Sequence, residues 1–151
     1  MTSEVPSVLF VCLGNICRSP ACEGIARKVA GDRINVDSCG TASYHTGESP
    51  DSRSQKACRG IGVDISKHRA RQIRSSDWTS FDLIVALDDS VLQDLQFDRP
   101  QNAKAKLVLF NAPHGVDDPY YGGQNGFETM AHLIEEKMGP FLEEFLHSVK
   151  A

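Results

Sequence analysis

The sequence predicts an α/β protein built on a parallel sheet. Three short apolar runs, at residues 8–11, 83–87 and 107–110, have the length of buried strands, and a shorter one lies at residues 34–36. Stretches with helical character separate these runs, so strands and helices alternate along the chain. Such alternation is typical of βαβ units, in which each strand lies parallel to its neighbours. The predicted fold class is therefore α/β with a parallel sheet.

Helix signals fall in the segments between these strands. The first helix is expected over residues 20–30 and the second over residues 52–59, each ended by a glycine. Short helical turns are expected at residues 75–80 and 90–95. Serine or aspartate lies at the start of each of these segments or just before it, and both residue types are favoured N-caps.

The last helix has the clearest pattern. Apolar residues recur there in steps of three and four, which places them on one helix face that packs on the sheet: Phe127, Met130, Ala131, Ile134, Met138, Phe141, Leu142 and Phe145. Gly139 and Pro140 interrupt the pattern. Because proline lacks a backbone donor, we expect a kink or a break at this point.

Length and composition limit the classes of protein that fit. A chain of 151 residues with 40% hydrophobic and 24% charged residues predicts one domain, residues 1–151. We expect no membrane span, because no apolar stretch is long enough, and no secretory signal at the N-terminus. A net charge of −4 argues against broad nucleic-acid binding. The five cysteines form no close pairs, so we expect reduced thiols, no metal site and a cytoplasmic location.

Residues 8–20 contain the most informative motif. A buried strand runs into Cys12, five residues separate Cys12 from Arg18, and Ser19 and Pro20 follow as the predicted cap and first turn of a helix. Successive N–H groups of so short a loop can form an anion-binding concavity, and the positive end of the helix faces it. Arginine can donate two parallel hydrogen bonds to a phosphate, and its guanidinium stays charged. This layout predicts a thiolate and a guanidinium around one phosphate.

The smaller residues of the loop suit this shape. Cys12 is the predicted nucleophile, since a helix N-terminus and a nearby cation favour a thiolate. Ser19 can donate a hydrogen bond to the sulfur in addition to capping the helix. Gly14 permits a tight backbone, and Asn15 suits a left-handed conformation.

These residues resemble the low molecular weight protein tyrosine phosphatases. Residues 11–20 read VCLGNICRSP, residues 118–122 read DPYYG and residues 70–72 read ARQ, in the order that this family has. The resemblance covers essentially the whole chain. It implies a four-stranded parallel sheet in the order 2-1-3-4 with helices on both faces, a phosphatase I or flavodoxin-like three-layer sandwich.

The resemblance also implies roles for residues outside the loop. Asp118 would be the general acid that protonates the leaving oxygen and then the base that activates water. Asp117 competes for this role, but the family's acid directly precedes proline. Asn15 would be anchored by Ser38 and His68, and Asp88 would lie near the pocket.

Aromatic and apolar residues are candidates for the walls of a substrate pocket. They are Leu13, Ile16, Tyr44, Tyr120 and Tyr121, with Tyr44 as the predicted specificity position. Loop tyrosines are equally often packing residues. Cys17 lies in the same loop as the nucleophile, so we expect it to trap an oxidised Cys12 as a disulfide.

The predicted activity is hydrolysis of phosphotyrosine and small aryl phosphates through a cysteinyl phosphate, without metal or cofactor. Expected partners are tyrosine-phosphorylated proteins, with phosphate and vanadate as inhibitors of a monomeric enzyme. Three alternatives remain: an arginine phosphatase, whose relatives carry threonine at the position of Ile16; a thioredoxin-coupled arsenate reductase, which needs cysteines beyond Cys58; and an inactive phosphotyrosine-binding module.

Overall fold

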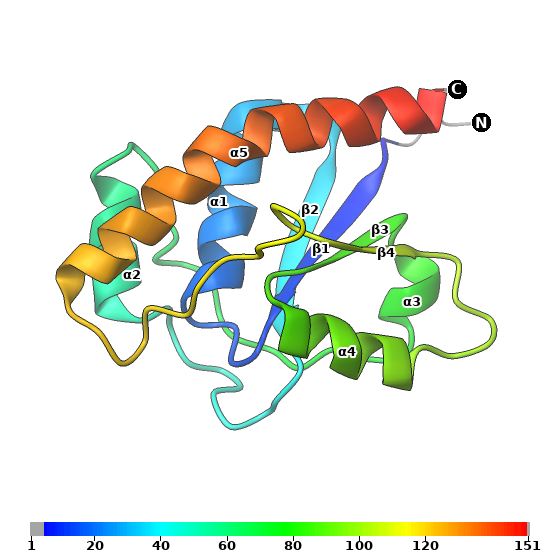
Figure 1. Cartoon of the computed structure of the whole chain (residues 1–151), viewed down its shortest axis with the longest axis horizontal. Helices are drawn as coiled ribbons and strands as arrows, with labels where there is room; N and C mark the ends of the chain where they lie inside the picture. Colours follow the sequence, from blue (N-terminus) through cyan, green and yellow to red (C-terminus); the bar gives the residue numbers. More distant parts are fainter. Residues whose placement is uncertain (1–4, 151) are drawn as a thin grey trace.

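The computed structural model describes residues 5–150 (Figure 1). Within these residues each strand is followed by at least one of five α-helices, and two helices lie between the second and third of the four strands. The strands are β1 (Ser7–Cys12), β2 (Asn35–Gly40), β3 (Leu83–Ala86) and β4 (Lys106–Leu109). The helices are α1 (Arg18–Ala30), α2 (Ser52–Arg59), α3 (Asp77–Ser80), α4 (Asp89–Asp98) and α5 (Gln124–Lys150), and a 3₁₀ turn, η1, covers Gly31–Arg33.

The four strands form one parallel sheet in the order β2-β1-β3-β4, which confirms the predicted topology. Strand β1 lies in the interior of the sheet, with Phe10 paired to Ser38 of β2 and to Val85 of β3. Its last residue, Cys12, lies opposite Gly40 at the end of β2. The loops that follow the strands therefore meet at the carboxyl edge of the sheet, where ligands bind in open α/β folds.

Helices cover both faces of the sheet, so the molecule has three layers (Figure 1). Helices α1, α2 and α5 lie on one face, whereas α3 and α4 lie on the other. The side chains of β1 alternate accordingly: Val8 and Phe10 join the core under α1 and α5, while Leu9 and Val11 join the core under α3 and α4.

One predicted helix feature is wrong, and of the kink or break expected at Pro140 only the break is excluded. Helix α1 begins at Arg18, so Ser19 lies inside the first turn and Cys17 is the N-cap residue, without a side-chain hydrogen bond. The Ser19 hydroxyl is instead directed to the Cys12 sulfur at the end of β1. Helix α5 runs unbroken through Pro140. The preceding Gly139 has no Cβ to clash with the proline ring, and the buried Met138 and Leu142 hold both sides of this position on the sheet.

The other boundaries agree well with the sequence pattern. Helix α2 has the predicted bounds, while β2 extends beyond residues 34–36 to Gly40. Its last three residues are buried although two of them are polar or glycine, which is why their apolar signal is weak. Within residues 5–150, none of the helices has the length and apolarity needed to cross a bilayer.

Candidate active site

The loop from Cys12 to Arg18 connects the end of β1 to the start of α1. The Cys12 side chain is 2% exposed, and its Sγ accepts a hydrogen bond from the Asn15 N–H at 3.3 Å. The Ser19 Oγ lies 2.9 Å from the same sulfur. Ser19 accepts from Asn15 Nδ2 at 2.7 Å, so its own hydrogen can point either to this sulfur or to the more distant Cys39 carbonyl at 3.4 Å. Two hydrogen-bonding groups thus lie against the Cys12 sulfur.

Arg18 is held in the interior beside this sulfur. Its side chain is 3% exposed, and Nη1 donates to Asp88 Oδ2 at 2.6 Å and to the Val116 carbonyl at 3.0 Å. Burial alone would lower the pKa of Arg18, but Cys12, Asp88 and Asp118 outweigh it and raise the pKa above its ordinary value. Arg18 is therefore a permanently charged group fixed in place before any ligand arrives.

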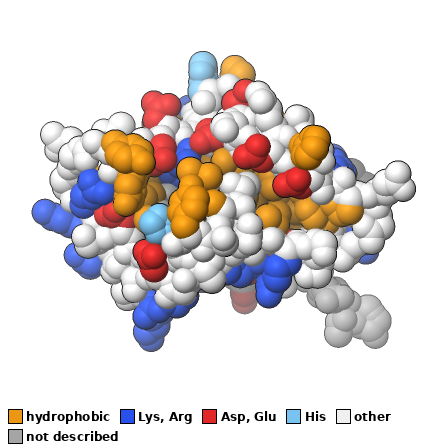
Figure 2. All heavy atoms as spheres, turned by 90° about the horizontal axis from the view of Figure 1, so that it is seen from below, with side chains coloured by type: hydrophobic (Ala, Val, Ile, Leu, Met, Phe, Trp, Pro, Cys, Tyr) orange, Lys and Arg blue, Asp and Glu red, His pale blue; other side chains and the backbone are white. Residues whose placement is uncertain are grey.

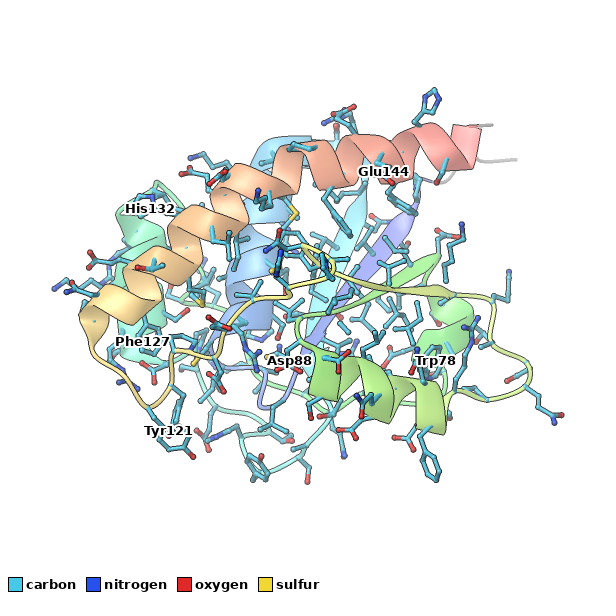
Figure 3. The ribbon with its side chains drawn as sticks, viewed as in Figure 1. Trp78, Asp88, Tyr121, Phe127, His132 and Glu144 are labelled. Carbon is cyan, nitrogen blue, oxygen red and sulfur yellow. The ribbon has the colours of Figure 1, made fainter. Side chains whose placement is uncertain are left out.

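Asp88 has a second structural role. Its Oδ1 accepts from the Val91 N–H at 2.7 Å and caps α4, while Oδ2 takes the bond from Arg18. Figure 3 shows Asp88 at the start of α4, on the side of the carboxyl edge. The cap holds the carboxylate in the orientation that Arg18 requires.

Asn15 holds the loop in shape. It is fully buried with φ at 60°, the left-handed conformation expected for it. Its Nδ2 donates to Ser19 and, at 3.0 Å, to Ser38 Oγ, while Oδ1 lies 3.0 Å from His68 Nε2. The Arg71 N–H also donates to Oδ1 at 3.0 Å. The contacts to Ser38 and His68 that the resemblance implied are present.

Glu23 of α1 extends this network, and the sequence analysis did not identify it. The Ser38 hydroxyl donates to Glu23 Oε1 at 2.7 Å, and His68 Nδ1 lies 3.4 Å from the same oxygen. Burial would raise the pKa of Glu23, but hydrogen bonds from His68, Ser38 and Arg27 lower it below its ordinary value. A carboxylate thus anchors the groups that hold Asn15.

Two glycines allow other segments to approach this loop closely. A Cβ at Gly40 would lie 2.6 Å from the Leu13 carbonyl oxygen, so the end of β2 can pack on the loop only without a side chain. A Cβ at Gly14 would lie 2.8 Å from His45 Cδ2. The φ of Gly14 is not positive, so a side chain at this position would have to displace the His45 ring but would not strain the backbone.

Asp118 lies across the pocket from this network, on the loop that precedes α5. Its Oδ2 is 3.6 Å from Arg18 Nη2, and its Oδ1 accepts from the Tyr120 N–H at 3.1 Å. The side chain is 39% exposed and lines the same cavity as Cys12. The neighbouring Asp117 is exposed and does not line this cavity.

The cavity above Cys12 has a volume of about 70 Å³. Its lining combines the loop with residues of the segment before α5: Cys12, Leu13, Gly14, Ile16, Cys17, Arg18, Asp118, Tyr120 and Tyr121. Tyr44, the predicted specificity position, is not in this lining. Its ring packs edge-on against His45 at 5.3 Å between centroids, and His45 in turn faces Tyr120 at 6.4 Å.

The mouth of the cavity carries exposed aromatic side chains. Tyr44 is 65% exposed and Tyr121 is 94% exposed. The loops around the site lie along the lower edge of Figure 1, and Figure 2 shows hydrophobic side chains standing out on that face beside a histidine and acidic groups. Figure 3 places Tyr121 on the loop before α5, pointing away from the core.

Cys17 is buried in the same loop. Burial, together with Asp51, Cys12 and Asp118, raises the pKa of its thiol well above the ordinary value, although Arg18 acts in the opposite direction. Cys17 is therefore a neutral thiol in the same loop as Cys12. In residues 5–150 no three histidine, cysteine or acidic side chains are grouped as a metal site would require.

A buried cysteine that accepts a loop N–H, and a buried arginine six residues later, lie at the end of the first strand and are typical of phosphatases of the cysteine-nucleophile class. The chain belongs to the low molecular weight phosphotyrosine protein phosphatase family, whose model matches residues 7–151. A Schizosaccharomyces pombe protein of that name is 41% identical, with 99% of each chain covered. The human protein of that name is 40% identical over 91% of this chain and 94% of its own.

Solved structures agree with this membership. A protein tyrosine phosphatase from Entamoeba histolytica, with Hepes in its active site, superposes with a TM-score of 0.88 at 35% identity, covering 97% of this chain and 99% of its own. The low molecular weight protein tyrosine phosphatase from Tritrichomonas foetus is 57% identical, with a TM-score of 0.82, and covers 95% of this chain and 98% of its own.

Proposed function

We propose that this protein is a phosphotyrosine phosphatase that acts through a cysteinyl phosphate held between Cys12 and Arg18. The observation that carries this proposal is the convergence on Cys12 Sγ of the Ser19 hydroxyl and the Asn15 N–H, beside a buried arginine and across the cavity from Asp118. These are the nucleophile, the charge stabilisation and the proton donor that phosphoryl transfer requires.

The first half of the reaction breaks the ester bond. The Cys12 thiolate attacks phosphorus, an S–P bond forms and the P–O bond to the phenol breaks. Asp118 gives its proton to the departing oxygen and becomes a carboxylate. Arg18 and the loop N–H groups stabilise the charge on the equatorial oxygens, which they can do without moving.

The second half regenerates the enzyme. A water molecule attacks phosphorus from the side that the phenol has left, and Asp118 takes its proton. The S–P bond breaks, the Cys12 thiolate returns and inorganic phosphate leaves. The hydrogen bond from Ser19 makes the sulfur a better leaving group in this step.

The pocket supports an aryl phosphate as substrate. Leu13, Tyr120 and Tyr121 provide apolar walls above the phosphate site. Ile16 offers no hydroxyl that could bond a guanidino nitrogen, which argues against phosphoarginine. No cysteine follows Cys58 in the sequence, so the thiol relay of an arsenate reductase has no candidate. The presence of Cys12, Arg18 and Asp118 argues against an inactive binding module.

The proposal extends to the setting in which the enzyme works. We infer one catalytic domain, since both faces of a single sheet carry the core and the family model spans residues 7–151. Five free, buried cysteines support a reducing compartment such as the cytoplasm. Tyrosine-phosphorylated proteins are the proposed partners.

The test is a panel of matched phosphotyrosine, phosphoserine and phosphoarginine peptides without added metal. We expect turnover of the phosphotyrosine peptide alone, unchanged by EDTA. Cys12→Ser should abolish turnover and still bind vanadate, because its hydroxyl is not ionised. Cys58→Ala, which removes a buried thiol outside the site, is the control and should keep activity. Preferred turnover of phosphoarginine, or turnover by Cys12→Ser, would contradict the proposal.

A further inference from the structure

The loop that carries Asp118 has few hydrogen bonds to the rest of the molecule, although Pro119 is buried and Tyr120 packs against the core. Within the loop, the Tyr120 N–H bonds to Asp118 and the Gly122 N–H bonds to the Pro119 carbonyl. Asp118 itself lies 3.6 Å from Arg18, which is longer than a hydrogen bond. A general acid needs a fixed position relative to the leaving oxygen, so other groups must hold this loop.

Arg53, in the first turn of α2, meets this requirement. Its Nη1 donates to the Gly122 carbonyl at 2.9 Å, and its Nη2 donates to the Tyr120 carbonyl at 3.0 Å. Across the described chain, residues 5–150, these are the hydrogen bonds that reach residues 117–122 from outside that loop. The guanidinium also lies 4.4 Å from the ring centroid of Phe127, at the start of α5 (Figure 3).

Asp51 fixes the orientation of the Arg53 guanidinium. Nε donates to Asp51 Oδ1 at 3.0 Å and Nη2 donates to Oδ2 at 2.9 Å, a bidentate pair. The Asp51 Oδ1 also accepts the Arg53 N–H at 2.9 Å and so caps α2. Arg53 therefore has little freedom, and its two donated bonds to the loop are set by helix α2.

Helix α2 is in turn bonded to the loop from Cys12 to Arg18, here called the phosphate loop. The Asp51 N–H donates to the Ile16 carbonyl at 2.8 Å, and the Ser54 hydroxyl donates to the Cys17 carbonyl at 3.0 Å. A continuous path of hydrogen bonds thus runs from the loop that binds phosphate, through Asp51 and Arg53, to the loop that carries Asp118.

We propose that Arg53 is a positioning residue that sets the distance between the general acid Asp118 and the phosphate loop. The proposal rests on the role given to Asp118 under the proposed function. Arg53 touches neither the phosphate nor the leaving group, so it acts through the position of Asp118. Loss of its guanidinium lets the acid move, which weakens protonation of the leaving oxygen and leaves the Cys12 and Arg18 geometry intact.

The expected signature is a dependence on the leaving group. A displacement of about 1 Å can cost about 10²-fold in rate. For Arg53→Met we therefore expect kcat/KM to fall by roughly 10-fold to 10²-fold for phenyl phosphate, whose leaving group needs a proton. An activated aryl phosphate should lose less than about 3-fold, since it departs without protonation. The plot of log kcat/KM against leaving-group pKa should become steeper.

Two further variants complete the series. Arg53→Lys keeps the charge opposite Asp51 and so protects the α2 cap, but an ammonium cannot bond Asp51 and both carbonyls at once, so the same steepening is expected in weaker form. Arg59→Met, at the other end of α2 and outside the site, is the matched control and should leave the plot unchanged. A merely destabilising change would reduce the active fraction, and with it kcat/KM, by one factor for every substrate.

A double-mutant cycle with Asp118→Ala tests whether Arg53 acts through the acid. We expect Arg53→Met to slow phenyl phosphate strongly in the wild type and by less than about 3-fold in Asp118→Ala, since the group it positions is gone. Equal losses in both backgrounds, or an unchanged plot for Arg53→Met and Arg53→Lys, would overturn the inference while Asp118 kept its role. If Asp118→Ala itself slowed phenyl phosphate no more than an activated aryl phosphate, the proposed function would fail instead.

Discussion

Replacing Asn15 by alanine should destabilise the protein far more than the same change at Asn111. Both residues have left-handed backbones, with φ at 60° and 56°, so alanine adds a comparable strain of about 1 kcal/mol at each. Asn111 makes one side-chain hydrogen bond, to the Gly115 carbonyl at 3.2 Å. Asn15 makes four.

The difference can be estimated from these contacts. At about 1 kcal/mol for each net hydrogen bond, Asn15→Ala should lose about 5 kcal/mol and Asn111→Ala about 2 kcal/mol. Urea unfolding followed by fluorescence measures both. Asn15→Gly relieves the strain, so its free energy of unfolding should be about 1 kcal/mol higher than that of Asn15→Ala. It should still lose vanadate affinity. If Asn15→Ala and Asn111→Ala lowered the free energy of unfolding equally, the reasoning would be refuted. The backbone strain that they share would then explain both losses, without any contribution from the extra hydrogen bonds of Asn15.

Three further predictions concern the groups around Cys12. Arg18→Lys should lose most of its kcat and of its vanadate affinity, because a point charge cannot replace the bidentate grip; near-wild-type kinetics would contradict this. Cys17→Ser should fail to recover from peroxide on addition of a reductant, and peptide mapping of the oxidised wild type should show a bond between Cys12 and Cys17. Because the folded-state pKa of Glu23 lies below its ordinary 4.5, its stabilisation is present above that pH and lost as the pH falls through the folded value. Glu23→Gln should therefore lower the free energy of unfolding by about 1–2 kcal/mol at neutral pH, and this difference from the wild type should shrink in acid. A difference that stays constant with pH would exclude the linkage.

The fold and the reacting groups could largely be predicted because their signals are local. Buried strands leave short apolar runs, and the loop from Cys12 to Arg18 lies within one contiguous motif. The sheet order came from the family resemblance, since apolar runs show that strands exist without showing which of them are neighbours. The prediction that Ser19 caps α1 failed, whereas its predicted contact with the Cys12 sulfur is present, because a serine before proline suits both roles and the tertiary contact prevailed.

The sequence did not predict the roles of Glu23, Arg53 and Arg71 at the site, for a different reason. Each acts on residues far away in the chain: Arg53 on the loop of Tyr120, and Arg71 on Asn15 through its backbone N–H. An acidic or basic residue on a helix or loop usually indicates a solvated face, so its charge alone carries no signal. Only the three-dimensional arrangement shows which of these charges hold the site.

The placement of β1 inside the sheet divides the active site into parts of unequal local stability. Cys12 ends a strand bonded on both sides, so its surroundings open only when the sheet itself unfolds, and the β1 amides should exchange hydrogen among the slowest. The loop of Asp118 depends on the two bonds from Arg53 and can open at a lower free energy. Mild denaturant should thus produce molecules that still capture phosphate and still cleave activated esters, yet no longer hydrolyse phosphotyrosine. Selectivity for the demanding substrate is then lost before the fold is.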